Sequence, residues 1–317
     1  MNAFRKAMLV VLVTAAVVPA AGGPVGWWRF EGKPGESADG EKVLSTVNPD
    51  AMTGEGHKSQ SENAKLEYSA DVPGQYVWDP IARRYRENAA SMRFAAFQAK
   101  TEAGNLFSYC DYVEVPDSPL SRPSGFTLEG FIKPHEDGNL KWCDIVGKTR
   151  SWNMVWGVDT EDYHPGGRLK MRFKLQVKGR KIIQHRDADS PNLKDRNWHH
   201  FALTYSPATG EIKLYWDYKL ADEFTTEDPK QRQLLYDPMK PGKTYPLLIG
   251  GRKDKGWNGW LDEIRLSDAP LPPEKFLRAT AEQTPGGPKE EPAADAPTAD
   301  KEPAPAPKET PAPAKAE

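Results

Sequence analysis

Several common protein classes are excluded by what is scarce in this sequence of 317 residues. Two cysteines are too few for a small domain held together by several disulfides. The 26 glycines are far fewer than the one residue in three that collagen requires. No apolar run reaches the roughly 20 residues that cross a bilayer as a helix. The composition is that of a globular protein with room for one large core or two ordinary ones.

Net charge is also small, and its distribution is more informative than its total of -2. The first 22 residues carry two basic residues and no acidic one, whereas residues 279–317 carry eight acidic residues and four lysines. The stretch 23–278 is therefore neutral. Binding to nucleic acid requires a broad excess of Lys and Arg that displaces counterions from phosphates, so we expect no nucleic-acid partner.

The two ends of the chain differ from its middle. Arg5 and Lys6 precede an apolar run, Ala7 to Val18, and small residues that end near Gly22. This order predicts a secretory signal peptide over residues 1–22 and a secreted, periplasmic or extracellular mature chain without a transmembrane segment; an uncleaved anchor is the alternative. Residues 279–317 are rich in Pro, Ala, Glu and Lys and contain no aromatic residue, which predicts a disordered tail.

The stretch 23–278 has the pattern of a single β-rich domain. Apolar and polar residues alternate over 169–177, 201–205 and 212–216, and segments rich in Gly and Pro separate these runs. Half-buried strands joined by such turns predict an all-β, two-sheet antiparallel sandwich. The clearest helix signal is short and lies over 272–278.

Several segments resemble the laminin-G-like jelly roll of the concanavalin A-like lectin and glucanase superfamily. The resemblance includes the opening GWWRFEG, the central FTLEGFIKP and the closing GWLDEIRL. It implies two curved antiparallel sheets in a domain over 23–278. Residues 56–90 are longer than the family usually has at this place, and we expect them to form an insertion over the sheet edge. The segments that carry the resemblance are 26–32, 111–118, 126–134, 198–205, 212–217, 248–251 and 259–266.

The resembled superfamily contains lectins, adhesion modules and glycosidases, so function has to be argued from sites. A retaining glycosidase needs two carboxyl groups about 5 Å apart, and the superfamily supplies them from alternate residues of one strand. No such run is present, and Glu129 with Asp217 would be the first candidates for an unrecognised pair. His199 and His200 are adjacent on a predicted strand and therefore face opposite sides, which favours packing over a shared metal.

A structural Ca²⁺ is the cofactor that the resemblance implies. On the closing strand, Asp262 has the same parity as Ile264 and is predicted to point inward, where a carboxylate needs a hydrogen bond or a cation. In the resembled superfamily an aspartate of this strand binds Ca²⁺ together with groups after the opening strand. The matching positions here are Glu31, Gly32 and Asp39. The alternative is that Asp262 accepts backbone N–H groups.

Two features are candidates for binding a ligand. Between residues 168 and 186 there are eight basic residues and no acidic one, and Lys170, Arg172 and Lys174 would form a cationic stripe for an acidic glycan. The alternative is an edge strand that these residues protect from aggregation. Trp152, Trp156 and Trp257 are candidates for stacking on sugar rings, with Trp260 on the rim, although tryptophans also fill sandwich cores.

Cys110 and Cys143 could form one disulfide in an oxidising compartment, or remain two buried thiols. Together the features predict an exported, non-catalytic carbohydrate-binding or adhesion module whose partner is a glycan or a cell-envelope component. The alternatives are a glycoside hydrolase and a structural envelope domain that binds proteins.

Overall fold

The computed structural model describes residues 22–60, 64–100, 106–136, 143–150, 153–163, 168–176, 183–184, 193–236, 243–252, 255–284 and 287–288. The predicted signal peptide, except Gly22, and the predicted tail beyond residue 288 lie outside these ranges. Within them, no helix has the length and apolar character needed to cross a membrane.

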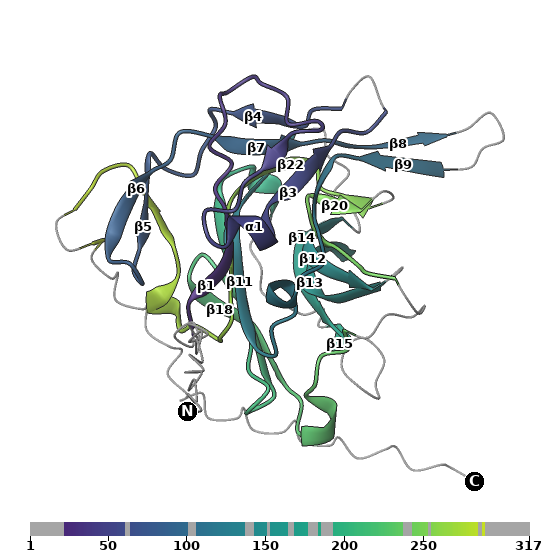
Figure 1. The fold of residues 1–317 in the computed structure, drawn as a ribbon, viewed down its shortest axis with the longest axis vertical. Helices are drawn as coiled ribbons and strands as arrows, with labels where there is room; N and C mark the ends of the chain where they lie inside the picture. Colours follow the sequence, from purple (N-terminus) through teal and green to yellow (C-terminus); the bar gives the residue numbers. More distant parts are fainter. Residues whose placement is uncertain are drawn as a thin grey trace, which may run out of the picture.

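Two large antiparallel sheets form the body of the protein (Figure 1). Sheet A has the strand order β18-β17-β16-β11-β22-β7-β4, and β1 also pairs with β22. Sheet B has the order β15-β14-β13-β12-β19-β10-β3-β2. The strands of sheet A are β1 (Pro24–Trp28), β4 (Glu67–Ser69), β7 (Ser91–Phe94), β11 (Phe126–Pro134), β16 (His199–Tyr205), β17 (Glu211–Trp216), β18 (Lys219–Thr225) and β22 (Gly259–Ser267). Those of sheet B are β2 (Lys42–Val43), β3 (Gly54–His57), β10 (Tyr112–Val115), β12 (Asp144–Arg150), β13 (Asn153–Tyr163), β14 (Arg168–Leu175), β15 (Ile183–Gln184) and β19 (Leu247–Ile249).

The predicted sandwich is confirmed, and the predicted strands fall where the alternation places them. The central strand β11 occupies the predicted range 126–134, and β14, β16 and β17 agree with the alternating runs to within two residues. The predicted helix is a single 3₁₀ turn, Pro273–Lys275. Pro273 starts this turn after Pro272 at the N-cap, and the turn ends because Phe276 already has an extended backbone.

The main core lies between the two sheets. Leu128 and Ile132 of β11 and Ile264 of β22 meet Val158 and Ile249 of sheet B there, all fully buried. Each of these residues alternates with one on the outer face of its sheet. Burial of such side chains supplies about 1.5–3 kcal/mol each, which makes this layer the main stabilising element.

A bulge in β22 changes the orientation of one predicted site residue. Glu263 has φ 50°, and the pairing with β11 shifts between Glu129, which pairs with Arg265, and Phe131, which pairs with Asp262. The extra residue breaks the alternation of two, so Asp262 shares the outer face with Phe131 instead of pointing inward with Ile264. The parity prediction for Asp262 is therefore corrected.

The outer face of sheet A is covered by a third layer. Strands β5 (Tyr76–Asp79) and β6 (Arg84–Glu87) pair with β23 (Arg278–Thr280), and Figure 1 shows β5 and β6 on the side of β1 and β11 opposite to β12–β14. We call this small sheet, with the segment 270–277 that leads into β23, the cap.

An apolar cluster joins the cap to sheet A. Val77 and Leu277 of the cap pack with Trp27 and Phe131 of sheet A. The expectation that 56–90 lies over a sheet edge is thus corrected in part, because β4 does extend the edge while β5 and β6 cover a face.

Candidate functional site

Beyond the end of the cap, one cross-strand row of polar and aromatic residues lies on the outer face of sheet A. Lys133 of β11 pairs with Trp260 of β22, Trp260 pairs with Arg93 of β7, and Arg93 pairs with Glu67 of β4. Their chain neighbours Ile132, Leu261 and Met92 are buried in the core, so the four residues of the row point the other way.

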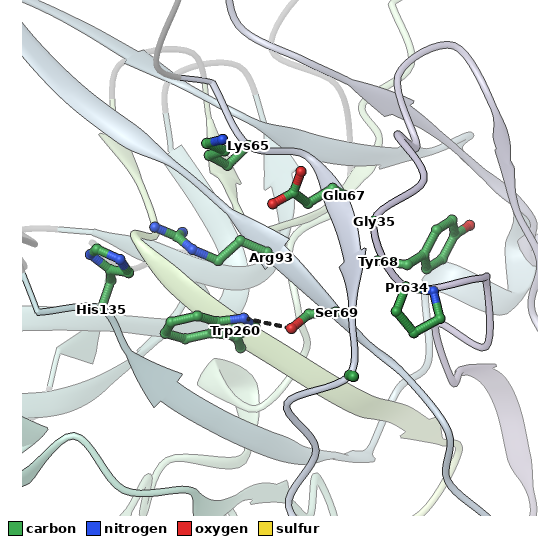
Figure 2. Close-up of a pocket in the computed structure, with 10 residues that line it drawn as sticks. Pro34, Gly35, Lys65, Glu67, Tyr68, Ser69, Arg93, His135 and Trp260 are labelled. Atoms are coloured by element: carbon green, nitrogen blue, oxygen red, sulfur yellow. Dashed lines mark hydrogen bonds between the residues drawn. The ribbon is translucent and has the colours of Figure 1, made fainter.

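Glu67, Arg93 and Trp260 of this row line the floor of a pocket of about 410 Å³, and Lys133 adjoins it. Loop residues before β4 and after β11 complete its walls. Figure 2 shows Trp260, Arg93 and His135 at one side of the pocket and Pro34 and Tyr68 at the other. The lining residues are Pro34, Gly35, Lys65, Glu67, Tyr68, Ser69, Ala70, Arg93, His135 and Trp260.

The indole of Trp260 is half-buried and held in one orientation. Its Nε1–H donates to Ser69 Oγ at 3.1 Å. The guanidinium of Arg93 lies 4.8 Å, and the ammonium of Lys133 5.4 Å, from the ring centroid. The His135 ring lies 5.5 Å away at an interplanar angle of 34°. Each cation contributes about 0.5–2 kcal/mol through the ring quadrupole, so the indole is positioned before any ligand arrives.

Arg93 is the most buried charge of the pocket, with 8% of its surface exposed. Its Nη2 donates to Asn258 Oδ1 at 2.9 Å and its Nη1 to the Gly259 carbonyl at 3.4 Å. Desolvation lowers the pKa of Arg93 to about 10, although Asp111 and Glu67 oppose the shift. The side chain is therefore still a cation at neutral pH, and the fork of N–H groups is fixed in place.

The pocket thus combines an aromatic face with hydrogen-bonding groups of both kinds. Lys65 and Arg93 are donors, Glu67 is an acceptor, and Ser69 is both. A ligand that fits this set has an apolar face for the indole and a rim of hydroxyl or charged groups. Such concave sites with a few placed polar groups are where small ligands bind.

The tryptophans predicted to stack on sugars lie elsewhere. Trp156 and Trp257 are fully buried in the core between the sheets, so neither ring presents a face to a ligand. Trp152 lies outside the described residues. Trp260 was predicted on the rim beside Trp257. The two indoles lie on opposite sides of sheet A, because Trp257 belongs to the core between the sheets and Trp260 lines the pocket on the outer face. The alternative of core packing therefore describes Trp156 and Trp257.

The predicted cationic stripe belongs to β14 in sheet B, whereas the strands that line the pocket, β4, β7 and β22, belong to sheet A. The register places Lys170 opposite Glu161 and Arg172 opposite Asp159 of β13, while Lys174 is opposite Gly157. Directly paired residues share one face of a sheet, so acidic positions adjoin two of the three basic ones. β14 is not the outermost strand, because Lys174 and Leu175 pair with β15.

The four predicted calcium ligands do not share an oxygen shell in this structure. Asp262 accepts hydrogen bonds from Asn88 Nδ2 and from the Glu263 amide, both at 2.8 Å. Glu31 forms an ion pair with Arg29 at 2.8 Å. The predicted alternative, an Asp262 that accepts backbone N–H groups, describes the Glu263 contact, while the second donor is the side chain of Asn88.

The other two predicted ligands lie in different surroundings. The Asp39 side chain accepts a hydrogen bond from the Lys58 amide at 2.8 Å. The Asp39 backbone forms an isolated β-bridge with Gly56 of β3, next to the β2 edge of sheet B. Gly32 lies against the ring of Tyr68. Among the described residues, no three His, Cys, Asp or Glu side chains converge as metal ligands. These donors therefore do not fit a calcium ion, which needs six or more oxygens.

Glu129, the first hydrolase candidate, is fully buried beneath the cap. Its Oε1 accepts from Arg265 Nε at 2.9 Å and from Nη2 at 2.6 Å, and its Oε2 accepts from the Leu277 amide at 2.8 Å and lies 3.1 Å from His200 Nε2. Burial alone would raise the pKa of Glu129, but Arg265 and His200 hold it below its usual range. The carboxylate has structural partners and no route to a substrate.

Asp217, the second hydrolase candidate, is partly exposed in the tight turn between β17 and β18. It bonds His199 Nδ1 at 2.8 Å and the His200 amide at 3.0 Å, while Asp195 lies 3.0 Å from His199 Nε2. His199 and His200 do point to opposite faces and bond different carboxylates, as their adjacency in a strand predicts.

No disulfide joins Cys110 and Cys143, and both residues are buried thiols. Burial raises the pKa of the Cys143 thiol to about 12. The structure therefore shows the second of the two alternatives derived from sequence.

The pocket was only partly visible in the sequence. Lys65, Glu67 and Ser69 lie in the segment predicted as an insertion, where no alternation singles out a face. Arg93 follows it in a four-residue strand. The usable signal was Trp260, an indole next to glycine on the closing strand.

Comparison with known families agrees with this architecture. A laminin-G-type family model, described as the concanavalin A-like lectin/glucanases superfamily, matches residues 107–275. The chain therefore belongs to this superfamily, which confirms the resemblance derived from its strands. No curated protein matches the chain.

Solved structures with similar folds share little sequence with this chain. Domain 4 of AbnA, a GH43 extracellular arabinanase from Geobacillus stearothermophilus, in complex with arabinotriose, has a TM-score of 0.48 and 10% identity over 81% of this chain and 97% of its own. A native heptameric SAP-like pentraxin from Limulus polyphemus has a TM-score of 0.32 and 13% identity over 58% and 79%. The receptor binding domain of botulinum neurotoxin type G has a TM-score of 0.42 and 9% identity over 80% and 49%.

Proposed function

We propose that this protein is a carbohydrate-binding module whose site is the Trp260 pocket. The observation that carries the proposal is the half-buried indole, fixed by Ser69, Arg93 and Lys133 at the floor of a pocket with polar walls. Sugars combine an apolar C–H face with a rim of hydroxyl groups, and this pocket offers a partner for each. A rigid aromatic ring also costs little conformational entropy when it binds.

We further propose that the preferred ligand is an acidic glycan. Lys65 and Arg93 line the pocket, Lys133 adjoins it, and Glu67 is the one acidic residue among the ten lining residues. The guanidinium of Arg93 suits a carboxylate or sulfate because its N–H groups form a planar fork. Attraction of this kind weakens as salt rises, because exposed charges are screened over about 8–10 Å at moderate ionic strength.

The proposed setting is outside the cytoplasm. The segment 1–22 has the order of charged, apolar and small residues that a secretory signal has. An exported module would meet polysaccharides of a cell envelope or of the surroundings. The first two residues of the predicted tail, Ala279 and Thr280, belong to β23, and the Pro- and Ala-rich stretch after this strand would act as a spacer.

A glycan array tests the proposal. The chain from residue 23 to 317 is screened at low and moderate salt, with Ca²⁺ and with chelator. We expect binding to uronate- or sulfate-containing glycans that weakens with salt and persists in chelator. Trp260→Ala should lower the affinity at least about tenfold, the equivalent of 1.4 kcal/mol.

The matched control is Trp78→Ala, which removes another half-buried indole, in β5, that packs against Tyr85 and is not among the pocket-lining residues. Equal loss of binding in both variants, at unchanged melting temperature, would contradict the placement of the site. Absence of binding to every glycan would favour a protein-binding envelope role.

A further inference from the structure

The row of residues that forms the pocket floor continues past Lys133 to a second indole. Ile132 of β11 pairs with His199 of β16, so the same register places Trp198 beside Lys133. The row then reads Trp198, Lys133, Trp260, Arg93 across neighbouring strands of sheet A. Trp198 immediately precedes β16, packs against the cluster that joins the cap to sheet A, and is half-buried. It is not among the pocket-lining residues.

Asp71 connects the two indoles through an ion pair. Its Oδ1 accepts from Trp198 Nε1 at 2.8 Å, and its Oδ2 lies 2.5 Å from Lys133 Nζ. The same Lys133 ammonium lies 5.4 Å from the centroid of Trp260. One carboxylate therefore fixes the orientation of Trp198 and the position of the cation beside Trp260.

The two indoles are too far apart for one sugar ring. Two strand intervals separate their positions in the row, and adjacent strands lie about 4.8 Å apart, so the backbones at Trp198 and Trp260 are about 10 Å apart across the sheet. A sugar stacked on one of them leaves the other for a different unit of the same chain. The line from one indole to the other runs across the strands and over the Asp71–Lys133 pair.

We propose that Trp198 is a second subsite, and that the site recognises a linear oligosaccharide of two or more units instead of a single sugar. This inference rests on the proposed function, since it extends the same surface. Asp71 and Lys133, whose side chains are 34% and 25% exposed, lie between the subsites and offer an acceptor and a donor to the connecting units. Two linked contacts bind more tightly than either one, because the second forms within an already bound molecule.

The test is a chain-length series. Calorimetric titration of the chain from residue 23 to 317 uses galacturonate and its linear oligomers up to the hexamer, with glucose and cello-oligosaccharides as the neutral series. For the wild type we expect the affinity to rise at least about tenfold between the monomer and the short oligomers and then to level off.

Trp198→Ala should remove this gain while the affinity for the monomer stays within about twofold, since Trp260 is unchanged. Trp198→Phe keeps a ring without the Nε1–H and should keep part of the gain. Trp260→Ala should lower the affinity for monomer and oligomers alike. A thermal melt of each variant identifies one that fails to fold, and the wild-type series does not depend on any variant.

Equal affinity of the wild type for monomer and hexamer would overturn the second subsite and leave the carbohydrate-binding function in place. Loss of monomer affinity in Trp198→Ala would also overturn it, because the two indoles would then form one site. Absence of binding to every member of both series would overturn the proposed function and this inference together.

Discussion

Arg265→Met should be among the most damaging single substitutions in this protein. Both Arg265 and Glu129 are fully buried under the cap, and the guanidinium donates two hydrogen bonds to one carboxylate oxygen. It also faces Asp79 at 3.3 Å. Removal of one partner leaves an uncompensated buried charge, which costs about 3–5 kcal/mol of unfolding free energy.

The double variant Arg265→Met, Glu129→Gln separates this effect from lost packing. The second substitution removes the carboxylate that Arg265 contacts most closely, and Gln can keep the hydrogen bond from the Leu277 amide. Asp79 retains the Ile81 and Ala82 amides as donors, so we expect recovery of about 2 kcal/mol or more relative to Arg265→Met. Urea unfolding at pH 7 measures each variant. A loss below about 1 kcal/mol in the single variant, or simple additivity in the double one, would refute a matched buried pair.

The same pair sets a dependence on acid. Although burial would raise the pKa of Glu129, Arg265 and His200 hold it below its usual range, so the carboxylate is ionised when folded. Its contribution is present above the unfolded pKa of about 4.3 and is lost as pH falls through the lower folded value. Glu129→Gln should remove this part of the acid sensitivity.

Three other substitutions test stability elsewhere in the fold, two of them through its dependence on pH. Burial lowers the pKa of His199, but its partners Asp217 and Asp195 raise the pKa by more. The stabilisation from protonated His199 is therefore present below about pH 6.5 and should be lost as pH rises through the folded pKa. His199→Phe should make the urea midpoint less dependent on pH between about pH 5 and 9. Desolvation raises the pKa of Glu263 to about 7 despite Arg29, so the wild type should lose stability as pH rises from about 4.5 to 7. Over this range the unfolding free energy of Glu263→Gln should rise relative to that of the wild type. A difference between the two proteins that does not change with pH would contradict this assignment. Gly56→Ala should lower the unfolding free energy by about 1–3 kcal/mol in the same assay, because a Cβ at this position of β3 would lie 1.9 Å from the Ala38 carbonyl oxygen. An unchanged unfolding free energy would mean that the loop containing Ala38 shifts without cost.

The strands of the sandwich could be predicted because each carries its own evidence. In β16 and β17 the apolar residues recur at every second position, and Phe201, Leu203, Ile212 and Leu214 of this set belong to the core between the sheets. The range of β11 followed from the family resemblance. These features are local, so a single sequence contains them.

The features that position the site depend on contacts distant in sequence. The bulge at Glu263 reverses Asp262, and it accompanies Gly130 on the partner strand, where a Cβ would lie 2.5 Å from Ile264 Cδ1. The sequence of β22 alone contains no residue pattern that predicts this bulge. The cap could not be predicted for the same reason. β5 pairs with β23, which follows about two hundred residues later, and the polar sequence of 56–90 has no alternation that predicts a buried face. Trp156 was ambiguous for a further reason, since a strand face rich in Trp describes a core and a binding surface equally well.

The outer face of sheet A contains two kinds of charged row, and the difference between them argues for where recognition occurs. Under the cap, Glu129 and Arg265 face each other and are closed off by Leu277, so their charges are satisfied within the protein. Four positions further along β11, at Lys133, the row lies beyond the apolar cluster that joins the cap to sheet A. There Lys133 and Arg93 lie against the accessible ring of Trp260, and the pocket walls carry more cations than anions. Lys133 and Arg93 also have partners within the protein, Asp71 and Asn258, but their row borders a pocket instead of the cap. A concave site with placed polar groups is the physical reason to assign binding there.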